Sequence, residues 1–171
     1  MAGITDNGRE HQHTITALVQ NHPGVLARVA GLFARRGFNI ESLAVSVTEN
    51  PEVSRMTIVA RGDDRVLEQI TKQLNKLIEV IRVVDYVEHT AVERELALIK
   101  VNADPKDRTE ILQLAEVFRG RVIDVGERTF LIELTGGTDK IDAFARLMAP
   151  YGIREMARTG VIAMARGTKT A

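Results

Sequence analysis

One pattern of secondary-structure signals occurs twice along the 171 residues of this chain, and the repeat limits the possible folds more than any other feature. In each half, a short aliphatic run typical of a β-strand is followed by apolar residues at helical spacing. Two strand-like runs joined by a turn come next, and a second helix and a last strand complete the pattern. Because tandem copies of one supersecondary unit fix the architecture, we expect two similar units in series.

The first copy of the pattern lies between residues 14 and 87. Its strand-like runs are residues 14–20, 40–49, 53–61 and 80–87, with a turn signal at residues 50–52 between the middle two. The first helix should begin at Val25 and end near Gly37, a glycine suited to a left-handed cap. Its apolar stripe is Leu26, Val29, Ala30 and Phe33. The second helix should follow an acidic cap at residues 62–64 and bury Leu67, Ile70, Leu74, Leu77 and Ile78.

The second copy repeats this order after residue 95. Strands are expected at residues 96–101, 122–125, 129–134 and 154–165, with an interruption of the last one at Gly160. Helices are expected at residues 107–118, closed by Gly120, and from a cap at Thr138 to a stop at residues 151–152. The order β-α-β-β-α-β in both halves predicts the α+β fold class, as two tandem ferredoxin-like units.

These signals divide the chain into four parts. Residues 1–12 are expected to be a disordered lead-in, residues 13–88 the first unit, residues 89–95 a charged connection and residues 96–171 the second unit. Each unit is small, and the chain has no tryptophan, so both cores must be built mainly from valine, isoleucine, leucine and alanine.

Charge and composition exclude several classes of function. The 23 basic residues balance the 23 acidic ones, and neither half is cationic, which argues against nucleic acid as the main partner. No cysteine is present, so the chain has no disulfide framework and no thiolate nucleophile or ligand. The first residues are polar, and no apolar run approaches the length of a membrane span. A soluble, cytoplasmic protein is therefore expected.

Signatures of catalysis are missing. The stretch at residues 136–140 lacks the spacing of a phosphate-binding loop, and no serine has an obvious base beside it. His11 and His13 could share one side of an extended segment, but a metal site needs further ligands. We therefore expect no catalytic residues, no metal and no cofactor in this chain.

The most informative loop is Asn21-His22-Pro23-Gly24, which leads directly into the first helix. The N–H groups and the positive dipole end of a helix are available to an anion when a glycine loop opens into its first turn. An ordinary turn would also explain this loop. A second amide, Asn39, follows the other end of the same helix, and about thirteen residues at 1.5 Å each place the two amides roughly 20 Å apart. A single ligand could reach both amides only if two copies of the chain were joined.

At these residues the chain resembles a known family. The opening NHPGVLARVAGLFARRGFNIESLAVSVTENPEVSRMTIV, together with ERELALIKV, EVFRGRVIDV and ARTGVIAMARG, is similar to the small regulatory subunit of acetohydroxyacid synthase, also called acetolactate synthase. The resemblance covers nearly the whole chain. It implies an N-terminal ACT domain, a C-terminal ferredoxin-like domain and no active site. The chain would bind and activate a separate catalytic subunit that carries thiamine diphosphate, magnesium and FAD.

The resemblance also implies feedback control by valine. The family's binding residues correspond to Asn21, Gly24 and Asn39, with neighbouring candidates Val25, Leu26 and Ile40. The expected strand order 4-1-3-2 places the strand from residue 40 at the edge of the sheet, where it can pair with its own copy. A two-fold homodimer with one continuous sheet would bring Asn39 of one chain toward the loop of the other. The valine would then lie at the dimer interface, with its carboxylate on the N–H groups of the helix start and its ammonium on the two asparagine oxygens.

Two functional classes stay open at this stage. The first is a regulatory subunit of acetolactate synthase, and the second is a free-standing ACT-type amino-acid sensor that controls another enzyme or a transporter. An independent enzyme on this scaffold is disfavoured, although a fold alone does not exclude it. The helix with Arg28, Arg35 and Arg36 and the hairpin at residues 50–55 could face a catalytic subunit, and an ordinary solvated face would explain them as well.

Overall fold

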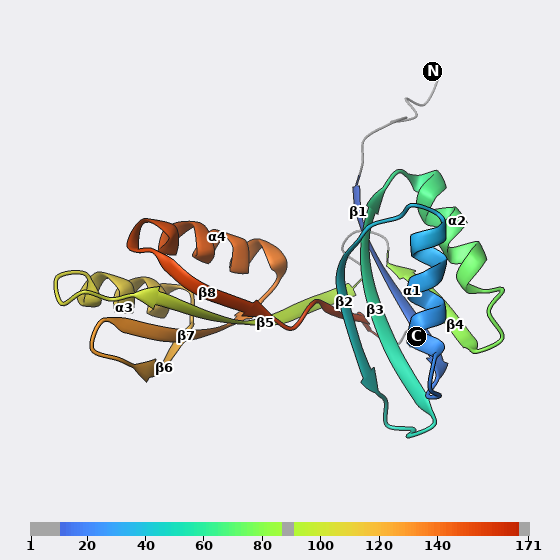
Figure 1. Ribbon diagram of the computed structural model, residues 1–171, viewed down its shortest axis with the longest axis horizontal. Coiled ribbons are helices and arrows are strands. Elements are labelled where there is room, and N and C mark those ends of the chain that lie inside the picture. Colours follow the sequence, from blue (N-terminus) through green and yellow to red (C-terminus); the bar gives the residue numbers. More distant parts are fainter. Residues whose placement is uncertain (1–10, 87–90, 168–171) are drawn as a thin grey trace, which may run out of the picture. The chain divides into compact units, whose positions relative to one another are not determined.

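The computed structural model describes residues 11–86 and 91–167, and Figure 1 shows its two groups of strands and helices. The described residues divide into two compact units. The first contains residues 11–92 and 163–167 apart from the gap, and the second contains residues 93–162. The lead-in expected at residues 1–12 lies outside the described residues except for its last two positions, which begin the first strand.

The first unit has the predicted order of elements. These are β1 (His11–Gln20), α1 (Val25–Arg35), β2 (Ile40–Val47), β3 (Val53–Gly62), α2 (Asp64–Leu74) and β4 (Val80–Tyr86). Its sheet has the order β2-β3-β1-β4, which confirms the predicted topology and leaves β2 at one edge. β1 pairs with β3 in an unbroken antiparallel register from His11 opposite Gly62 to Gln20 opposite Val53. This register explains why β1 begins at His11 rather than at residue 14.

The core of the first unit lies between the sheet and the two helices. On the face of the sheet that belongs to this core, the residues of the central strands are buried, and they include Ile15, Ala17, Val19, Met56, Ile58 and Ala60. Helix α1 contributes Val25, Val29, Leu32 and Phe33 to this core. The predicted stripe was wrong at Leu26, which is 44% exposed, and at Ile78, which is 91% exposed. Ile78 lies beyond the end of α2, because that helix stops at Leu74.

The second unit repeats the arrangement. Its elements are β5 (Ala91–Asn102), α3 (Arg108–Val117), β6 (Arg121–Val125), β7 (Thr129–Gly136), α4 (Thr138–Met148), the short helix η1 (Ala149–Tyr151), β8 (Ile153–Arg158) and β9 (Ile162–Ala165). The first residues of β5 and the last residues of β9 belong to the first unit. The sheet has the order β6-β7-β5-β8, and β9 also pairs with β5. The predicted fold class, two tandem ferredoxin-like units, is therefore confirmed. Strand β5 begins at Ala91 rather than Leu96, so it includes residues expected in the connection.

The first helix of each unit ends in a left-handed residue, but only one of the two is a glycine. At the end of α1, Gly37 has φ 71°, its N–H donates to Ala34, and Phe38 N–H donates to Phe33. In α3 the left-handed residue is Arg119, at φ 54°, and the N–H of Gly120, predicted to close this helix, donates to Ala115 at 2.7 Å. Gly120 is required for another reason. A Cβ there would lie 3.2 Å from the backbone oxygen of Glu133, so this position needs the space and not the dihedral angle.

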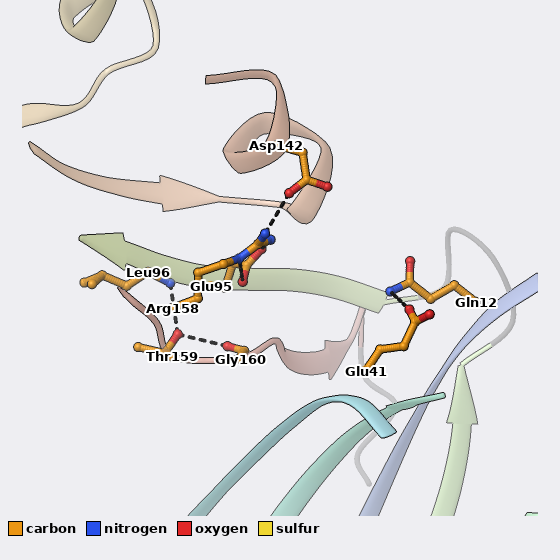
Figure 2. A network of polar contacts seen from close by, with 8 residues as sticks. All are labelled: Gln12, Glu41, Glu95, Leu96, Asp142, Arg158, Thr159 and Gly160. Atoms are coloured by element: carbon orange, nitrogen blue, oxygen red, sulfur yellow. Dashed lines mark hydrogen bonds and ion pairs between the residues drawn. The ribbon is translucent and has the colours of Figure 1, made fainter. Parts of the chain in front are cut away.

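A partly buried ionic network closes the core of the second unit (Figure 2). The guanidinium of Arg158 on β8 binds both carboxylate oxygens of Glu95 on β5 and, at 2.7 Å, the carboxylate of Asp142 on α4. The side chain of Glu95 is 3% exposed and that of Arg158 is 28% exposed. The network therefore joins two neighbouring strands to the helix that covers them.

Candidate functional site

The loop between β1 and α1 opens onto free space at Gly24. This residue is the N-cap of α1 and has φ 87°, a conformation that glycine adopts without strain. A Cβ placed on Gly24 would have no atom within 4 Å. The next residue, Val25, is buried in the core, whereas Leu26 is exposed. The helix is therefore anchored immediately behind its open first turn.

This first turn keeps backbone donors available. Arg28 N–H donates to Gly24 at 3.0 Å and Val25 N–H makes a long contact of 3.4 Å with His22. Among the described residues, no acceptor in the chain binds the N–H groups of Leu26 and Ala27, no side chain caps the helix, and its first turn has no acidic residue. A carboxylate at this end would find free donors and a favourable dipole.

Asn21 is fixed by the hairpin between β2 and β3. Its backbone N–H donates to Glu52 at 2.8 Å and its side-chain Nδ2 donates to the backbone oxygen of Pro51 at 2.9 Å. Its Oδ1 accepts a hydrogen bond of 3.1 Å from the hydroxyl of Ser54. The oxygen expected to receive a ligand ammonium thus already has one donor. It keeps a second lone pair, because an amide oxygen can accept two hydrogen bonds.

The other two predicted residues lie at the far end of the same helix. Asn39 is exposed just before β2, and Ile40 is half-buried opposite Ala60. Since α1 has 11 residues, its ends are separated by roughly 16 Å. Within one chain, the structure therefore brings together Asn21, Gly24, Val25 and Leu26, and places Asn39 and Ile40 apart from them.

The edge strand β2 presents apolar side chains beside the open helix end. Val45 is 41% exposed and Val47 is 51% exposed, although both share the core-facing side of the sheet with Met56 and Ser54. Chain direction places the end of β2 near the start of α1, because both lie at the same end of the sheet. Together with Leu26, these valines form an exposed apolar edge.

Comparison with known proteins shows the family of this chain. The chain is 60% identical over 158 residues to the probable acetolactate synthase small subunit of Archaeoglobus fulgidus, covering 92% of this chain and 99% of that protein. It is 54% identical over 157 residues to the acetolactate synthase small subunit of Mycolicibacterium smegmatis, covering 92% of each. The chain belongs to the acetolactate synthase small subunit family.

Family models and a solved structure extend this membership to both units. A model described as the AHAS small subunit-like ACT domain matches residues 15–82. A model described as the small subunit of acetolactate synthase matches residues 94–167. The crystal structure of the Thermotoga maritima acetolactate synthase small subunit superposes with a TM-score of 0.85 at 47% identity, covering 93% of this chain and 99% of that one. The chain is thus a regulatory subunit of acetolactate synthase with an N-terminal ACT domain.

Sequence reasoning missed the residues that hold Asn21 in place. Ser54 is 6% exposed and lies on the core-facing side of β3, opposite Val19. A lone serine among the apolar core positions of this strand was a signal that could have been used. Arg28, for which a partner-facing role and a solvated face were both left open, forms an ion pair with Glu79, which precedes β4.

The corresponding loop of the second unit differs in charge. Asp107 is the N-cap of α3, and Glu110 lies in the first turn of that helix. Asp104 accepts the backbone N–H groups of Asp107 and Arg108 through its own backbone oxygen. The guanidinium of Arg108 binds the backbone oxygens of Ala103, Gly126 and Glu127 and lies over the ring of Phe130. At this helix start the backbone donors and the Arg108 side chain are already hydrogen-bonded within the chain, and Asp107 and Glu110 are acidic.

The described residues offer no metal site as an alternative. In that part of the chain, no three metal-binding side chains gather. No helix among residues 11–86 and 91–167 is long and apolar enough to cross a membrane. The loop at the start of α1, with its open Gly24 and its uncapped first turn, is the candidate ligand site.

Proposed function

We propose that this regulatory subunit binds the catalytic large subunit of acetolactate synthase in the cytoplasm, activates it, and makes it sensitive to feedback inhibition by valine. Branched-chain amino acid biosynthesis, the route to valine, leucine and isoleucine, would be the controlled pathway. On this proposal thiamine diphosphate, magnesium and FAD belong to the catalytic subunit. The observation that carries the proposal is the uncapped first turn of α1, open at Gly24.

Valine would bind between two copies of the chain. Edge strand β2 offers unpaired backbone groups, and the exposed Val45, Val47 and Leu26 beside it would be covered if two copies joined their sheets there. Such a two-fold homodimer would bring Asn39 and Ile40 of one chain toward the loop at Asn21 of the other. The partner copy would thus supply the half of the site that a single chain lacks.

Each part of the ligand has a complementary group in this arrangement. The carboxylate would accept from the free N–H groups at the start of α1, where the helix dipole also favours negative charge. The ammonium would donate to the side-chain oxygens of Asn21 and Asn39. A small aliphatic side chain would lie against Val25, Leu26 and Ile40. Such a pocket distinguishes one methylene by only about 1–3 kcal/mol, so leucine and isoleucine should bind more weakly than valine.

The regulatory role is tested by reconstitution. Purified catalytic large subunit should be captured by this chain, gain activity on its addition, and lose that gain as valine is titrated. A free-standing amino-acid sensor would bind valine without capturing or activating the large subunit, and that result would refute the proposed role.

The position of the site is tested by a pair of matched variants. Gly24→Asp places a carboxylate beside the ligand carboxylate, whereas Gly24→Asn has the same shape, tolerates the left-handed conformation and carries no charge. Two like charges about 4 Å apart cost from about 1 kcal/mol in water to about 4 kcal/mol near a protein surface. Calorimetry should therefore show valine binding weakened roughly fivefold to a thousandfold in Gly24→Asp relative to Gly24→Asn. Equal affinities in two folded variants would mean that the site is elsewhere.

A further inference from the structure

The candidate loop and the β2–β3 hairpin form one hydrogen-bonded assembly. Asn21 contributes both its backbone N–H and its side-chain Nδ2 to the turn of the hairpin, at Glu52 and Pro51. The turn is continuous with the edge strand β2. Any displacement of the Asn21 amide is therefore transmitted to the hairpin without an intervening side chain.

The orientation of the Asn21 amide is determined by chemistry. The backbone oxygen of Pro51 can only accept, so the nitrogen of the amide must face it. Oδ1 then faces the hydroxyl of Ser54, which donates to it at 3.1 Å. Asn21 is an exposed residue, and these two contacts restrict a side chain that would otherwise rotate in solvent. Restricting a binding group before the ligand arrives lowers the entropy lost on binding.

Ser54 reaches Asn21 from inside the core. It is 6% exposed, and its backbone pairs with Val19 on one side and Val47 on the other. A buried hydroxyl needs a partner, because an unmade hydrogen bond in this environment is costly. Asn21 Oδ1 is the partner that the structure gives it. The contact thus links a fixed core residue to the exposed end of the candidate site.

The hairpin itself is closed by a dense set of hydrogen bonds. Thr48 binds the backbone of Asn50 and Val53 through its hydroxyl, and its N–H donates to Val53. The side-chain oxygen of Asn50 accepts from Glu52 N–H at 3.0 Å, and its backbone oxygen accepts from Val53 N–H at 3.0 Å. With its turn closed in this way, the hairpin should respond to a change at Asn21 as a single body.

We propose that Ser54 is a positioning residue of the effector site, and that residues 48–53 are the element through which occupancy of that site is signalled. The inference rests on the proposed function, because it assumes that an α-amino acid binds at Asn21. Its ammonium would use the second lone pair of Oδ1, while Ser54 keeps the first. Ser54 would not touch the ligand.

Three substitutions at Ser54 test the positioning role in the full-length chain with the catalytic large subunit. Ser54→Ala removes the hydroxyl, and Ser54→Cys replaces it with a thiol, a weak donor of similar shape. Ser54→Thr keeps the hydroxyl on a residue type that is common in strands. Loss of one hydrogen bond of ordinary strength corresponds to roughly a threefold to tenfold weaker affinity. Calorimetry should show this loss for Ser54→Ala and Ser54→Cys, whereas Ser54→Thr should stay within about twofold of the wild type.

Two further readouts separate positioning from a general structural role. The valine concentration that half-inhibits the catalytic subunit should rise in Ser54→Ala relative to the wild type, because the Asn21 amide loses the hydrogen bond that orients it. Hydrogen exchange should show that valine slows the amides of residues 48, 52 and 53 in the wild type. In Ser54→Ala saturated with valine, this protection should be smaller.

The outcomes distinguish failure of the positioning role from failure of the proposed function on which it rests. If the wild type binds no valine, the proposed function fails. If the wild type binds valine and Asn21→Ala removes binding, but Ser54→Ala binds like the wild type, the positioning role is refuted and the proposed function stands. If valine protects the first turn of α1 and leaves residues 48–53 unchanged, the hairpin is not the signalling element.

Discussion

Removing the carboxylate of Glu95 should destabilise the second unit by about 2–3 kcal/mol. Glu95→Ala breaks two charge-assisted hydrogen bonds to Arg158 and leaves the guanidinium with Asp142 alone. Loss of one partner of a fully buried ion pair costs about 3–5 kcal/mol. Because the Arg158 side chain is 28% exposed and keeps Asp142 as a partner, water and that carboxylate reduce this cost.

Two companion variants separate the charge from the packing. Asp142→Asn should cost less than about 1 kcal/mol, since the Asp142 side chain is 43% exposed. The double variant Glu95→Leu/Arg158→Leu should be more stable than Glu95→Leu alone, because it leaves no unpaired charge in a buried position. The hydrogen bonds to Glu95, and then that to Asp142, raise the pKa of Arg158. Because the pKa is higher in the folded chain, the contribution of Arg158 to stability is lost as the pH rises through the arginine range.

Hydrogen exchange is the appropriate assay, because a chain of two units need not unfold in one step. The slowest amides of β5 and β7 report the free energy of unfolding of the second unit, and those of β1 and β3 serve as an internal reference. The reference should not change. A loss below about 0.5 kcal/mol for Glu95→Ala, well under the cost of a broken buried pair, would refute this reasoning. A double variant less stable than Glu95→Leu would do the same.

Gly62→Ala should cost about 1–3 kcal/mol in the first unit, because its Cβ would lie 2.6 Å from the nearest methyl group of Val66 on α2. Gly137→Ala, in the second unit at a site with no atom within 4 Å, should change stability by less than about 1 kcal/mol. Hydrogen exchange of the slowest amides in each variant's own unit measures both changes. Burial and then a hydrogen bond to Glu110 raise the pKa of Tyr151 above its usual value of 10.0. The unfolded chain therefore loses this proton first, so stability should fall as the pH rises above about 10. Tyr151→Phe should reduce that fall, and an unchanged alkaline profile would contradict the assignment.

The repeat made the architecture predictable, and errors arose where a local signal had two explanations. Gly120 was predicted to close the helix, and its N–H does bind Ala115, but the left-handed residue there is Arg119, and Gly120 also leaves space for the backbone of β7. Ile78 continues the apolar spacing of α2. The helix nevertheless ends at Leu74. The side-chain Nδ2 of Asn75 donates to the backbone oxygen of Thr71, and the N–H groups of Lys76 and Leu77 donate to oxygens three residues earlier instead of four. Periodicity alone does not contain this information.

Only the part of the candidate site that depends on neighbouring residues in the sequence could be predicted. The conformation of Gly24 and the order of the strands follow from residues close in sequence. The contacts of Asn21 with Pro51 and Ser54 join positions that are 30 and 33 residues apart. They depend on the register of β1 against β3, which a sequence pattern does not determine. Valine at a dimer interface stays a prediction.

The acidic start of α3 has a consequence for stoichiometry. An amino-acid carboxylate approaching that helix would meet Asp107 and Glu110, and the N–H groups of Arg108 and Ile111 are already bound to Asp104 and Asp107. We therefore expect the proposed effector site in the first unit only, so a valine titration should saturate at one equivalent per protomer. Substitutions on the surface of the second unit should then leave the affinity for valine unchanged.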